Sequence, residues 1–426
     1  MGGHEAYVHA QANALAMQGH RLTVATAIKE VFSPWPKELG HSIQYITHET
    51  LHKFLDGQNT YERRSRRNKD CPLLLCDPDI VFTHGGVDPW IIKKLARVLP
   101  TIHFVHSPGD YCPSGTKYHP KKGQPCHIRP SAFQCLTQSV VGGCFFDGGG
   151  NQMGVRLMSS LLGQFQMKRR LVYPAVQAIV AQSHYVVDEL KMIFEKTPHL
   201  NSKIFVLSPP LPLATLPYKP QWQESQGSNQ LLFVGRLHST KGVEDLIQAL
   251  QFLPDGSKLT IVGDGPQRRF LERLAQELCA PQTVRFVGWV EQARLRKLYL
   301  THTLLLLPSR WPEPFGLVGV EAMAHGLPVI AYDVGGISGW LEPSRGGYLV
   351  EPGNVQALAR VIEQAFQNPD EMDRKSAEGQ AYIKAHFCPE AYLKRLEKII
   401  EQAMGNFHFD SRGFRLIGSA EQGSVL

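Results

Sequence analysis

Two glutamates in the stretch Ser309–Gly326, SRWPEPFGLVGVEAMAHG, have a spacing suited to binding a polar ligand. Glu313 lies in a turn stiffened by two prolines, and Glu321 follows after seven intervening residues. The helical pattern begins near Leu317, so Glu321 falls about one turn into a helix. We therefore expect the two carboxylates to bind opposite ends of one long ligand, with Glu313 on sugar hydroxyls and Glu321 on ribose hydroxyls.

Two cations in an earlier loop are suited to a diphosphate. Arg236 and Lys241 lie five residues apart in FVGRLHSTKG, and a leaving diphosphate needs such neutralisation as its charge grows. Free N–H groups at the start of the helix near Leu317 would add an anion site. Each signal is weak alone, since loop cations are usually solvated and a pair of glutamates at this spacing arises by chance. Their order along the chain carries the prediction.

The elements that must position these residues alternate between strand and helix patterns. In the second half each informative motif directly follows a short apolar strand, and the turn Gly263-Asp264-Gly265 follows the next strand after Arg236. Repeated β-α-β units predict a parallel sheet with helices on both faces, and ligands bind beyond the carboxyl ends of its strands. The loops should therefore gather on one rim.

The domain organisation follows from a Pro-, Gln- and Ser-rich break in the pattern. We predict two Rossmann-like domains facing each other across a cleft. The expected ranges are a first domain at 1–207 with an irregular Cys-bearing insertion at about 107–155, a linker at 208–229, a second domain at 230–387, a helix at 388–404 packing back on the first domain, and a tail without regular structure at 405–426.

Histidines mark the corresponding strand ends of the first half. IHFVHSPGDYC contains His103 and His106, and we favour His106 because it stands at the carboxyl end of the strand. His84, in FTHGG, has a similar position and either lines the acceptor side or is structural. The turn Asp77–Asp79 reads D-P-D, but its proline and the strand that follows indicate a strand-entry turn rather than a metal-diphosphate motif.

Four of the eight cysteines are close in sequence, namely Cys112, Cys126, Cys135 and Cys144. They contain no CxxC pair, which makes them a poor match to usual zinc spacings. Unrelated reduced thiols and a structural metal site are both compatible with the pattern. The other four, Cys71, Cys76, Cys279 and Cys388, are expected to act as small apolar residues.

Composition and charge set limits on location and partners. No apolar run is long enough for a membrane span, and MGGHEAYVHA lacks the features of a secretory signal, so a cytoplasmic protein is expected. Residues 1–207 hold 23 Lys and Arg against 15 Asp and Glu, including the run Tyr61–Asp70. That run is either a solvated loop or a contact with an anionic membrane at its inner face. It lacks the interleaved aromatics of a nucleic-acid site.

The motifs together resemble retaining glycosyltransferases of family 4 (glycosyl transferases group 1), which have the GT-B fold. The likeness is strong from about Leu231 to Phe387 and moderate from Gly2 to Ser208, and it rests on FVGRLHSTKG, IVGDGP, VRFVGWV, PSRWPEPFGLVGVEAMAHGLPVIA, VGG and GGYLVEPGN. It implies catalytic roles for His106, Arg236, Lys241 and Glu313. It implies donor contacts by Gly2, Gly3, Arg236, Lys241, Glu313, Phe315, Gly316, Leu317 and Glu321.

The resemblance implies transfer of a hexose from a nucleotide-sugar, UDP- or GDP-linked, with retention of anomeric configuration. The acceptor would be a growing glycan, a polysaccharide or a lipid-linked saccharide, and no metal would be required at the diphosphate. Alternatives are a non-catalytic nucleotide-sugar-binding protein, or an epimerase or phosphorylase with two similar lobes. In the family an apolar strand precedes the Gly-Gly turn, whereas here Met1 precedes Gly2 directly. We therefore expect a start some ten or more residues upstream, which would supply that first strand.

Overall fold

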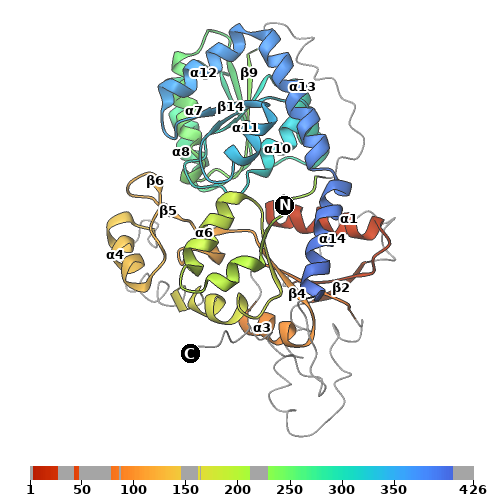
Figure 1. The fold of residues 1–426 in the computed structure, drawn as a ribbon. Coiled ribbons are helices and arrows are strands. Elements are labelled where there is room, and N and C mark those ends of the chain that lie inside the picture. Colours follow the sequence, from red (N-terminus) through yellow and green to blue (C-terminus); the bar gives the residue numbers. More distant parts are fainter. Residues whose placement is uncertain are drawn as a thin grey trace.

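The described chain consists of two parallel-sheet lobes, one above the other in Figure 1. The computed structural model describes residues 3–26, 43–47, 78–85, 88–144, 162–163, 165–211 and 229–405. Gly2, the basic run Tyr61–Asp70, Asp77, Cys71 and Cys76 lie outside these ranges, as do most of the predicted linker and the tail after residue 405. None of the described helices is both long and apolar enough to cross a bilayer.

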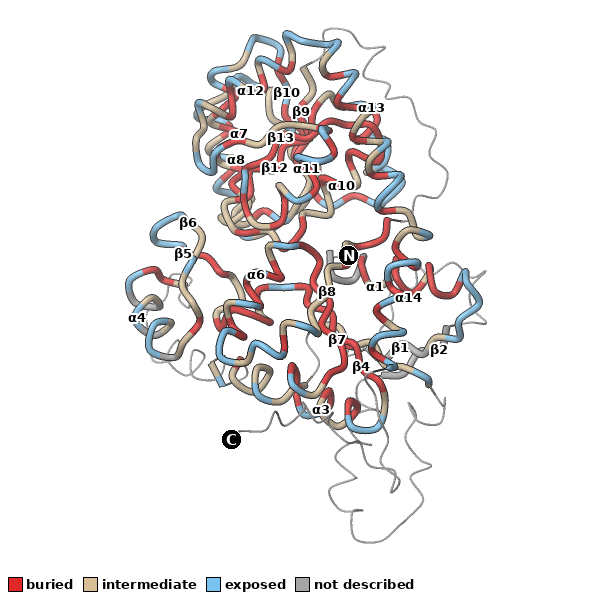
Figure 2. Tube along the Cα trace, in the orientation of Figure 1, coloured by how far each residue is buried: buried red, intermediate tan, exposed pale blue. Residues whose placement is uncertain are grey.

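The C-terminal lobe is a six-stranded sheet in the order β11-β10-β9-β12-β13-β14, with every neighbouring pair parallel. The central strands β9 and β12 read LLFV and LLLL and are largely buried (Figure 2), as expected where helices cover both faces of a sheet. The strands are β9 (Gln230–Val234), β10 (Lys258–Val262), β11 (Val284–Gly288), β12 (Leu304–Leu307), β13 (Val329–Tyr332) and β14 (Gly347–Val350). The helices are α7 (Val243–Ala249), α8 (Arg268–Leu278), α9 (Gln292–Thr301), α10 (Leu317–Ala324), α11 (Ser338–Ser344), α12 (Val355–Gln367) and α13 (Pro369–His386), with short turns η6 (Ser239–Lys241) and η7 (Leu250–Phe252).

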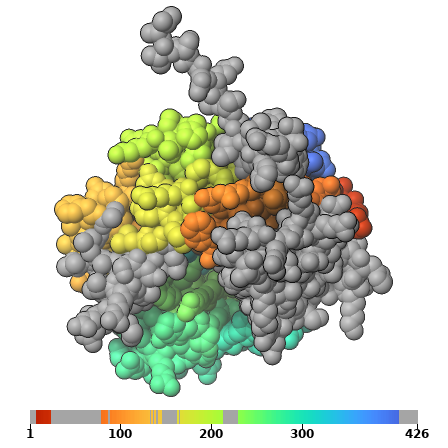
Figure 3. Space-filling model, turned by 90° about the horizontal axis from the view of Figure 1, so that it is seen from below, coloured from red at the N-terminus to blue at the C-terminus, as the bar shows by residue number. Residues whose placement is uncertain are grey.

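The N-terminal lobe holds two separate parallel sheets among its described residues, β1-β2 and β3-β4-β7-β8. The strands are β1 (Leu22–Thr26), β2 (Ile43–Thr47), β3 (Val81–His84), β4 (Thr101–Val105), β7 (Ala178–Ala181) and β8 (Ile204–Val206). The helices are α1 (Gly3–Met17), α3 (Pro89–Val98), α4 (Ala132–Gly142) and α6 (His184–Phe194), with short turns η2 (Pro108–Asp110), η3 (Lys168–Val172) and η4 (Pro198–Lys203). On the underside of the molecule, α3 packs beside η3 (Figure 3).

The predicted insertion is less irregular than expected, because residues 132–142 form α4. Its boundary signals are present in the sequence. Ser131 caps the start by accepting a hydrogen bond from the Gln134 N–H, and Gly143 ends the helix in a left-handed conformation at φ 72°. Before α4, strands β5 (Tyr118–His119) and β6 (Gln124–Pro125) form a small antiparallel hairpin.

The last helix, α14 (Pro389–Gly405), leaves the C-terminal lobe and lies against α1 (Figure 1). Its apolar face joins one core with α1 and the sheet of the N-terminal lobe, through residues that include Leu396 and Phe104. Tyr392 is buried and receives a hydrogen bond of 2.7 Å from Gln11. The two lobes are therefore joined by a packed helix as well as by the chain near Leu211.

Candidate active site

The loops after β9 and β10 are joined by backbone hydrogen bonds into one rim. Gly235 donates to Val262 and Leu237 donates to Asp264, both at 3.0 Å. Gly263 has φ 125°, and a Cβ there would lie 1.9 Å from the Gly235 carbonyl oxygen. Only glycine allows this close approach, which explains the IVGDGP motif as a structural requirement of the rim.

The two cations of the β9 loop have different surroundings. Arg236 is exposed at the rim. Lys241 lies deeper, where its ammonium pairs with the Glu313 carboxylate and stands 5.1 Å from the centre of the Trp311 ring. Gly242 places this loop against the β12 loop, because its missing Cβ leaves room for the Pro308 carbonyl oxygen. Lys241 and Glu313, separated by 72 positions, are thus side by side.

Glu313 is held as a carboxylate by its neighbours. Ser309 donates a hydrogen bond of 2.7 Å to the same oxygen that Lys241 contacts. Burial acts to raise the pKa of Glu313. The Lys241 charge and the hydrogen bonds together outweigh this effect, so the pKa lies below its ordinary value. The loop after β13 supports this turn from behind, since Gly336 donates a hydrogen bond of 2.7 Å to the Glu313 carbonyl.

The turn after Glu313 leads into α10 as the sequence predicted. Gly316 precedes the helix with φ 87°, and α10 begins at Leu317. The Phe315 side chain is buried, and its carbonyl accepts a hydrogen bond of 2.6 Å from Trp340. The Phe315 carbonyl is thereby fixed, while the first N–H groups of α10 lack partners within the helix. This arrangement suits an anion.

Glu321 lies one turn into α10, on the side that faces α9. Tyr299 donates a hydrogen bond of 3.2 Å to its carboxylate. Burial raises the pKa of Glu321 to about 7, against the lowering effect of that hydrogen bond and of Arg296. The two glutamates therefore differ in charge state near neutral pH, because Glu313 has a cation beside it whereas Glu321 has a phenol.

In the N-terminal lobe, His106 forms a pair with His84. His106 Nε2 and His84 Nδ1 are 2.7 Å apart, and the Gln182 amide nitrogen lies 2.5 Å from His106 Nδ1. An amide nitrogen donates, so His106 accepts at Nδ1 and donates from Nε2 to His84. Tyr7 packs edge-on against the His106 ring at 4.6 Å. His106 is thus held in one tautomer, with both ring nitrogens engaged.

One contact between the lobes places this histidine pair near Glu313. Ser183, which follows Gln182 and caps α6, donates a hydrogen bond of 2.6 Å to the carbonyl of Pro314. A Cβ on Gly336 would lie 2.6 Å from the same Ser183 hydroxyl. The turn that holds His106 therefore touches the turn that holds Glu313.

His103 has a different role from His106. It is buried, lies 2.9 Å from the Thr83 hydroxyl and 3.8 Å from the Asp110 carboxylate. Asp110 is fully buried and also pairs with Lys168 at 2.7 Å. These contacts belong to the interior of the lobe.

Three positions at the site were not anticipated from the sequence. Gln182 fixes His106, Tyr299 contacts Glu321, and Arg310 forms ion pairs with Glu244 and the buried Asp245 of α7. Arg310 precedes Glu313 by three residues, and this proximity in sequence could have indicated that Arg310 lies near the site. No comparable signal exists for Gln182 and Tyr299, because the residues next to them in sequence do not show which distant side chain each will contact.

Of the two N-terminal glycines, Gly2 lies outside the described residues, and Gly3 is the first residue of α1. Asp79 is exposed in the turn before β3. The donor contacts expected of Gly2 and Gly3 remain predictions.

The two facing Rossmann-like lobes define the GT-B fold class, as the structural comparisons show. HepE of Anabaena, solved in complex with UDP and with UDP-glucose, superimposes with TM-scores of 0.62 and 0.63 at 18% identity. Each superposition covers 94% of this chain and 96% of HepE. At this identity the likeness establishes the fold alone.

Sequence comparisons relate both lobes to glycosyltransferases. Residues 217–382 match the family described as "Glycosyl transferases group 1", and residues 1–139 match "Glycosyltransferase Family 4". An uncharacterized glycosyltransferase of Methanocaldococcus jannaschii is 37% identical over 32% of this chain and 36% of its own. Glycogen synthase of Mycobacterium tuberculosis is 33% identical over 38% of this chain and 39% of its own. The match thus spans well under half of each of these relatives.

Proposed function

We propose that the chain is a glycosyltransferase that moves a hexose from a UDP- or GDP-sugar to a saccharide acceptor, with retention at the anomeric carbon. The observation that carries the proposal is the cluster of Lys241, Glu313 and the start of α10 at the carboxyl ends of β9 and β12. The family matches of both lobes and the GT-B fold support it.

In this proposal the diphosphate lies between Arg236, Lys241 and the first N–H groups of α10. As the bond to the sugar breaks, negative charge builds on the diphosphate, and these groups stabilise it. Two cations and a helix start supply this stabilisation through the protein, so we propose that turnover needs no divalent cation at the diphosphate.

The two glutamates then bind the two ends of the donor. Glu313, charged and beside the proposed phosphate site, accepts hydrogen bonds from sugar hydroxyls, and Glu321 accepts them from the ribose. His106 and His84 form the opposite wall, where the N-terminal lobe meets the Glu313 turn through Ser183. The acceptor is a growing glycan, a polysaccharide or a lipid-linked saccharide bound on that side.

The test starts with a thermal-shift screen of the full chain against UDP, GDP, ADP and their common sugar conjugates. A stabilising donor is then incubated with saccharide acceptors in excess chelator, and the anomeric configuration of the product is read by NMR. We expect stabilisation by one base class and an α-linked product from an α-linked donor. Failure of every nucleotide to stabilise the chain contradicts the donor site, and an inverted product contradicts retention.

A further inference from the structure

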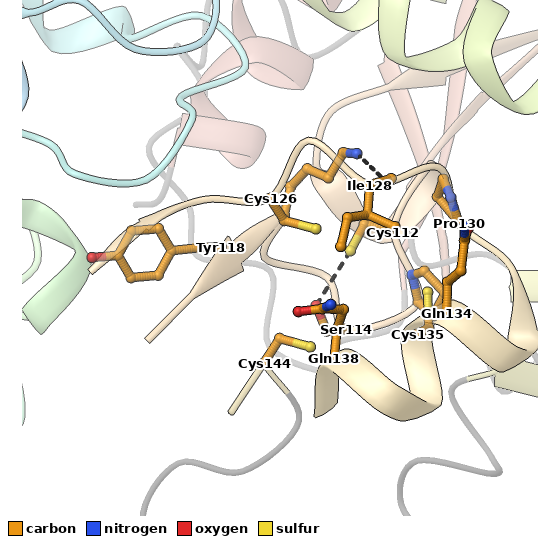
Figure 4. A pocket seen from close by; sticks show the side chains of 12 residues that line it. Cys112, Ser114, Tyr118, Cys126, Ile128, Pro130, Gln134, Cys135, Gln138 and Cys144 are labelled. Carbon is orange, nitrogen blue, oxygen red and sulfur yellow. Dashed lines mark hydrogen bonds between the residues drawn. The ribbon is translucent and has the colours of Figure 1, made fainter. Parts of the chain in front are cut away.

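Four thiols from separate pieces of the N-terminal lobe meet around one small cavity. Cys112 follows η2, Cys126 follows β6, Cys135 is in the first turn of α4, and Cys144 lies just beyond its end. All four line the same cavity, and Figure 4 shows them around a common space. The four residues span 32 positions of sequence without regular spacing, so only the fold brings them together.

The cavity has room for one water-sized particle. Its volume is about 20 Å³, and a cavity needs roughly 10–15 Å³ to hold one water-sized particle. Among the described residues, Gln138 also lines this cavity, and its carbonyl oxygen is buried without a hydrogen-bond partner.

The four thiols face the same small space. Thiolates placed this close together repel, and a divalent cation between them would reverse that repulsion.

We propose that Cys112, Cys126, Cys135 and Cys144 bind one Zn²⁺ as a structural four-thiolate site. Zn²⁺ takes four thiolates in a tetrahedron with Zn–S distances of about 2.3 Å, and each thiol loses its proton on binding. As placed, the side chains of the described residues do not form a ready group of three or more metal ligands. The set closes when the four thiols rotate about their Cα–Cβ bonds toward the middle of the cavity.

The segment has little regular structure of its own. Between Ser107 and Cys144 this structure is limited to η2, a two-residue ladder and α4, while the buried Lys117–Glu189 ion pair and the pairing of Asp110 with Lys168 tie the segment to the rest of the lobe. A metal cross-link would add a constraint within the segment, because it would join its start, its hairpin and both ends of α4.

The same cross-link would hold a contact with the donor lobe. Tyr118 extends from the hairpin away from the thiols toward the C-terminal lobe (Figure 4) and is only 4% exposed. The charges of Arg310, Glu244 and Asp245 act on it across the lobes. Because Arg310 belongs to the loop of Glu313, the zinc site would support the wall beside the donor.

The test measures metal content of the full chain, expressed with added zinc and purified without chelator, by inductively coupled plasma mass spectrometry. We expect one zinc per chain, and well under half of that in each of the variants Cys112→Ser, Cys126→Ser, Cys135→Ser and Cys144→Ser. The variants Cys279→Ser and Cys388→Ser change thiols outside the cavity and should retain all of it. Zinc well below one per chain, or retained in the four variants, overturns the proposal.

A second measurement covers variants that fail to fold. Zinc in the unaltered chain is displaced with a mercurial reagent in the presence of a colorimetric zinc indicator, and cobalt is then substituted for it. We expect about one zinc released and intense thiolate-to-cobalt absorption typical of tetrahedral sites. An iron-sulfur absorption near 400 nm, or disulfides among these four cysteines found by mass spectrometry, overturns it. Metal content is read without activity, so this proposal and the glycosyltransferase proposal can fail separately.

Discussion

The two glutamates of the site show how neighbours decide the charge of a side chain. Glu313 has Lys241 and Ser309 on its carboxylate, whereas the buried Glu321 carboxylate accepts a hydrogen bond from the Tyr299 phenol and has no ion pair among the described residues. Their pKa values therefore move in opposite directions. Predictions at the scale of the residue follow from this difference.

Removing Lys241 should affect both turnover and its pH dependence. We expect Lys241→Ala and Arg236→Ala each to lower kcat by at least ~10²-fold, because each removes a cation from the developing diphosphate charge. Only Lys241→Ala should also shift the acidic side of the kcat/KM pH profile to higher pH, since the Lys241 charge then no longer opposes the effect of burial on the pKa of Glu313. Arg236→Ala is the matched control for this shift, because it removes a cation that does not pair with Glu313. An unshifted profile in Lys241→Ala would show that the pair does not set the Glu313 charge.

Glu321 should make nucleotide affinity depend on pH. Its folded pKa of about 7 lies above the ordinary value of 4.5, so the carboxylate that we propose accepts hydrogen bonds from the ribose hydroxyls is protonated as pH falls through 7. We expect nucleotide affinity to fall about ten-fold from pH 8 to pH 6, as the ionised fraction does. Calorimetry on Glu321→Gln at both pH values isolates this effect from titration of the phosphates. If both proteins show equal pH dependence, the assignment of Glu321 to the ribose fails.

At the scale of the element, the loop after β13 supports the loop after β12. Gly335 has φ 60°, and a Cβ there would lie 2.2 Å from the Glu313 carbonyl oxygen. Backbone contact with the Glu313 turn therefore requires glycine in the VGG motif.

Gly335→Ala should displace the Glu313 turn. The unfavourable φ and the clash together are expected to lower the free energy of unfolding by about 1–3 kcal/mol. Because the Glu313 turn is displaced, kcat should fall as well. Gly339→Ala is the control, because nothing lies within 4 Å of its added Cβ. Urea unfolding and kcat of both variants form the measurement. Equal stability of the two variants contradicts the packing argument.

At the scale of the whole molecule, α14 connects the lobes through a buried polar cluster. Tyr392 accepts from Gln11 at 2.7 Å and lies 3.1 Å from the Tyr7 hydroxyl, and Tyr7 also packs on His106. The helix that ends the described chain therefore reaches the histidine pair through one side chain.

Tyr392→Phe should destabilise the N-terminal lobe without disturbing the C-terminal lobe. The change leaves the buried Gln11 amide without its partner, at a cost of about 1–3 kcal/mol. Hydrogen exchange should show faster opening in α1 and β4 and unchanged protection in β9 and β12. Tyr382→Phe, on the partly exposed face of α13, serves as the control. Uniform loss of protection in both lobes would contradict a local role for α14.

Much of the fold was predictable because its signals are local. Short apolar runs bounded by loops gave the strands of the C-terminal sheet, and the predicted start of α10 at Leu317 is confirmed. The helix α4 was missed, although Ser131 and Gly143 are ordinary cap residues, because its apolar pattern is weak. The GT-B fold is confirmed by the comparisons, whereas the roles of individual site residues remain predictions.

The residue types at the strand ends could be predicted, because strand and helix periodicity and the position of a residue after a strand are properties of neighbouring residues. Which of these residues meet depends on how the elements pack. The pairing of Lys241 with Glu313, of Gln182 with His106 and of Ser183 with Pro314 joins positions 72 to 131 residues apart. The gathering of four thiols likewise depends on how a hairpin packs against α4. Such contacts depend on the packing of whole elements, which local sequence does not encode.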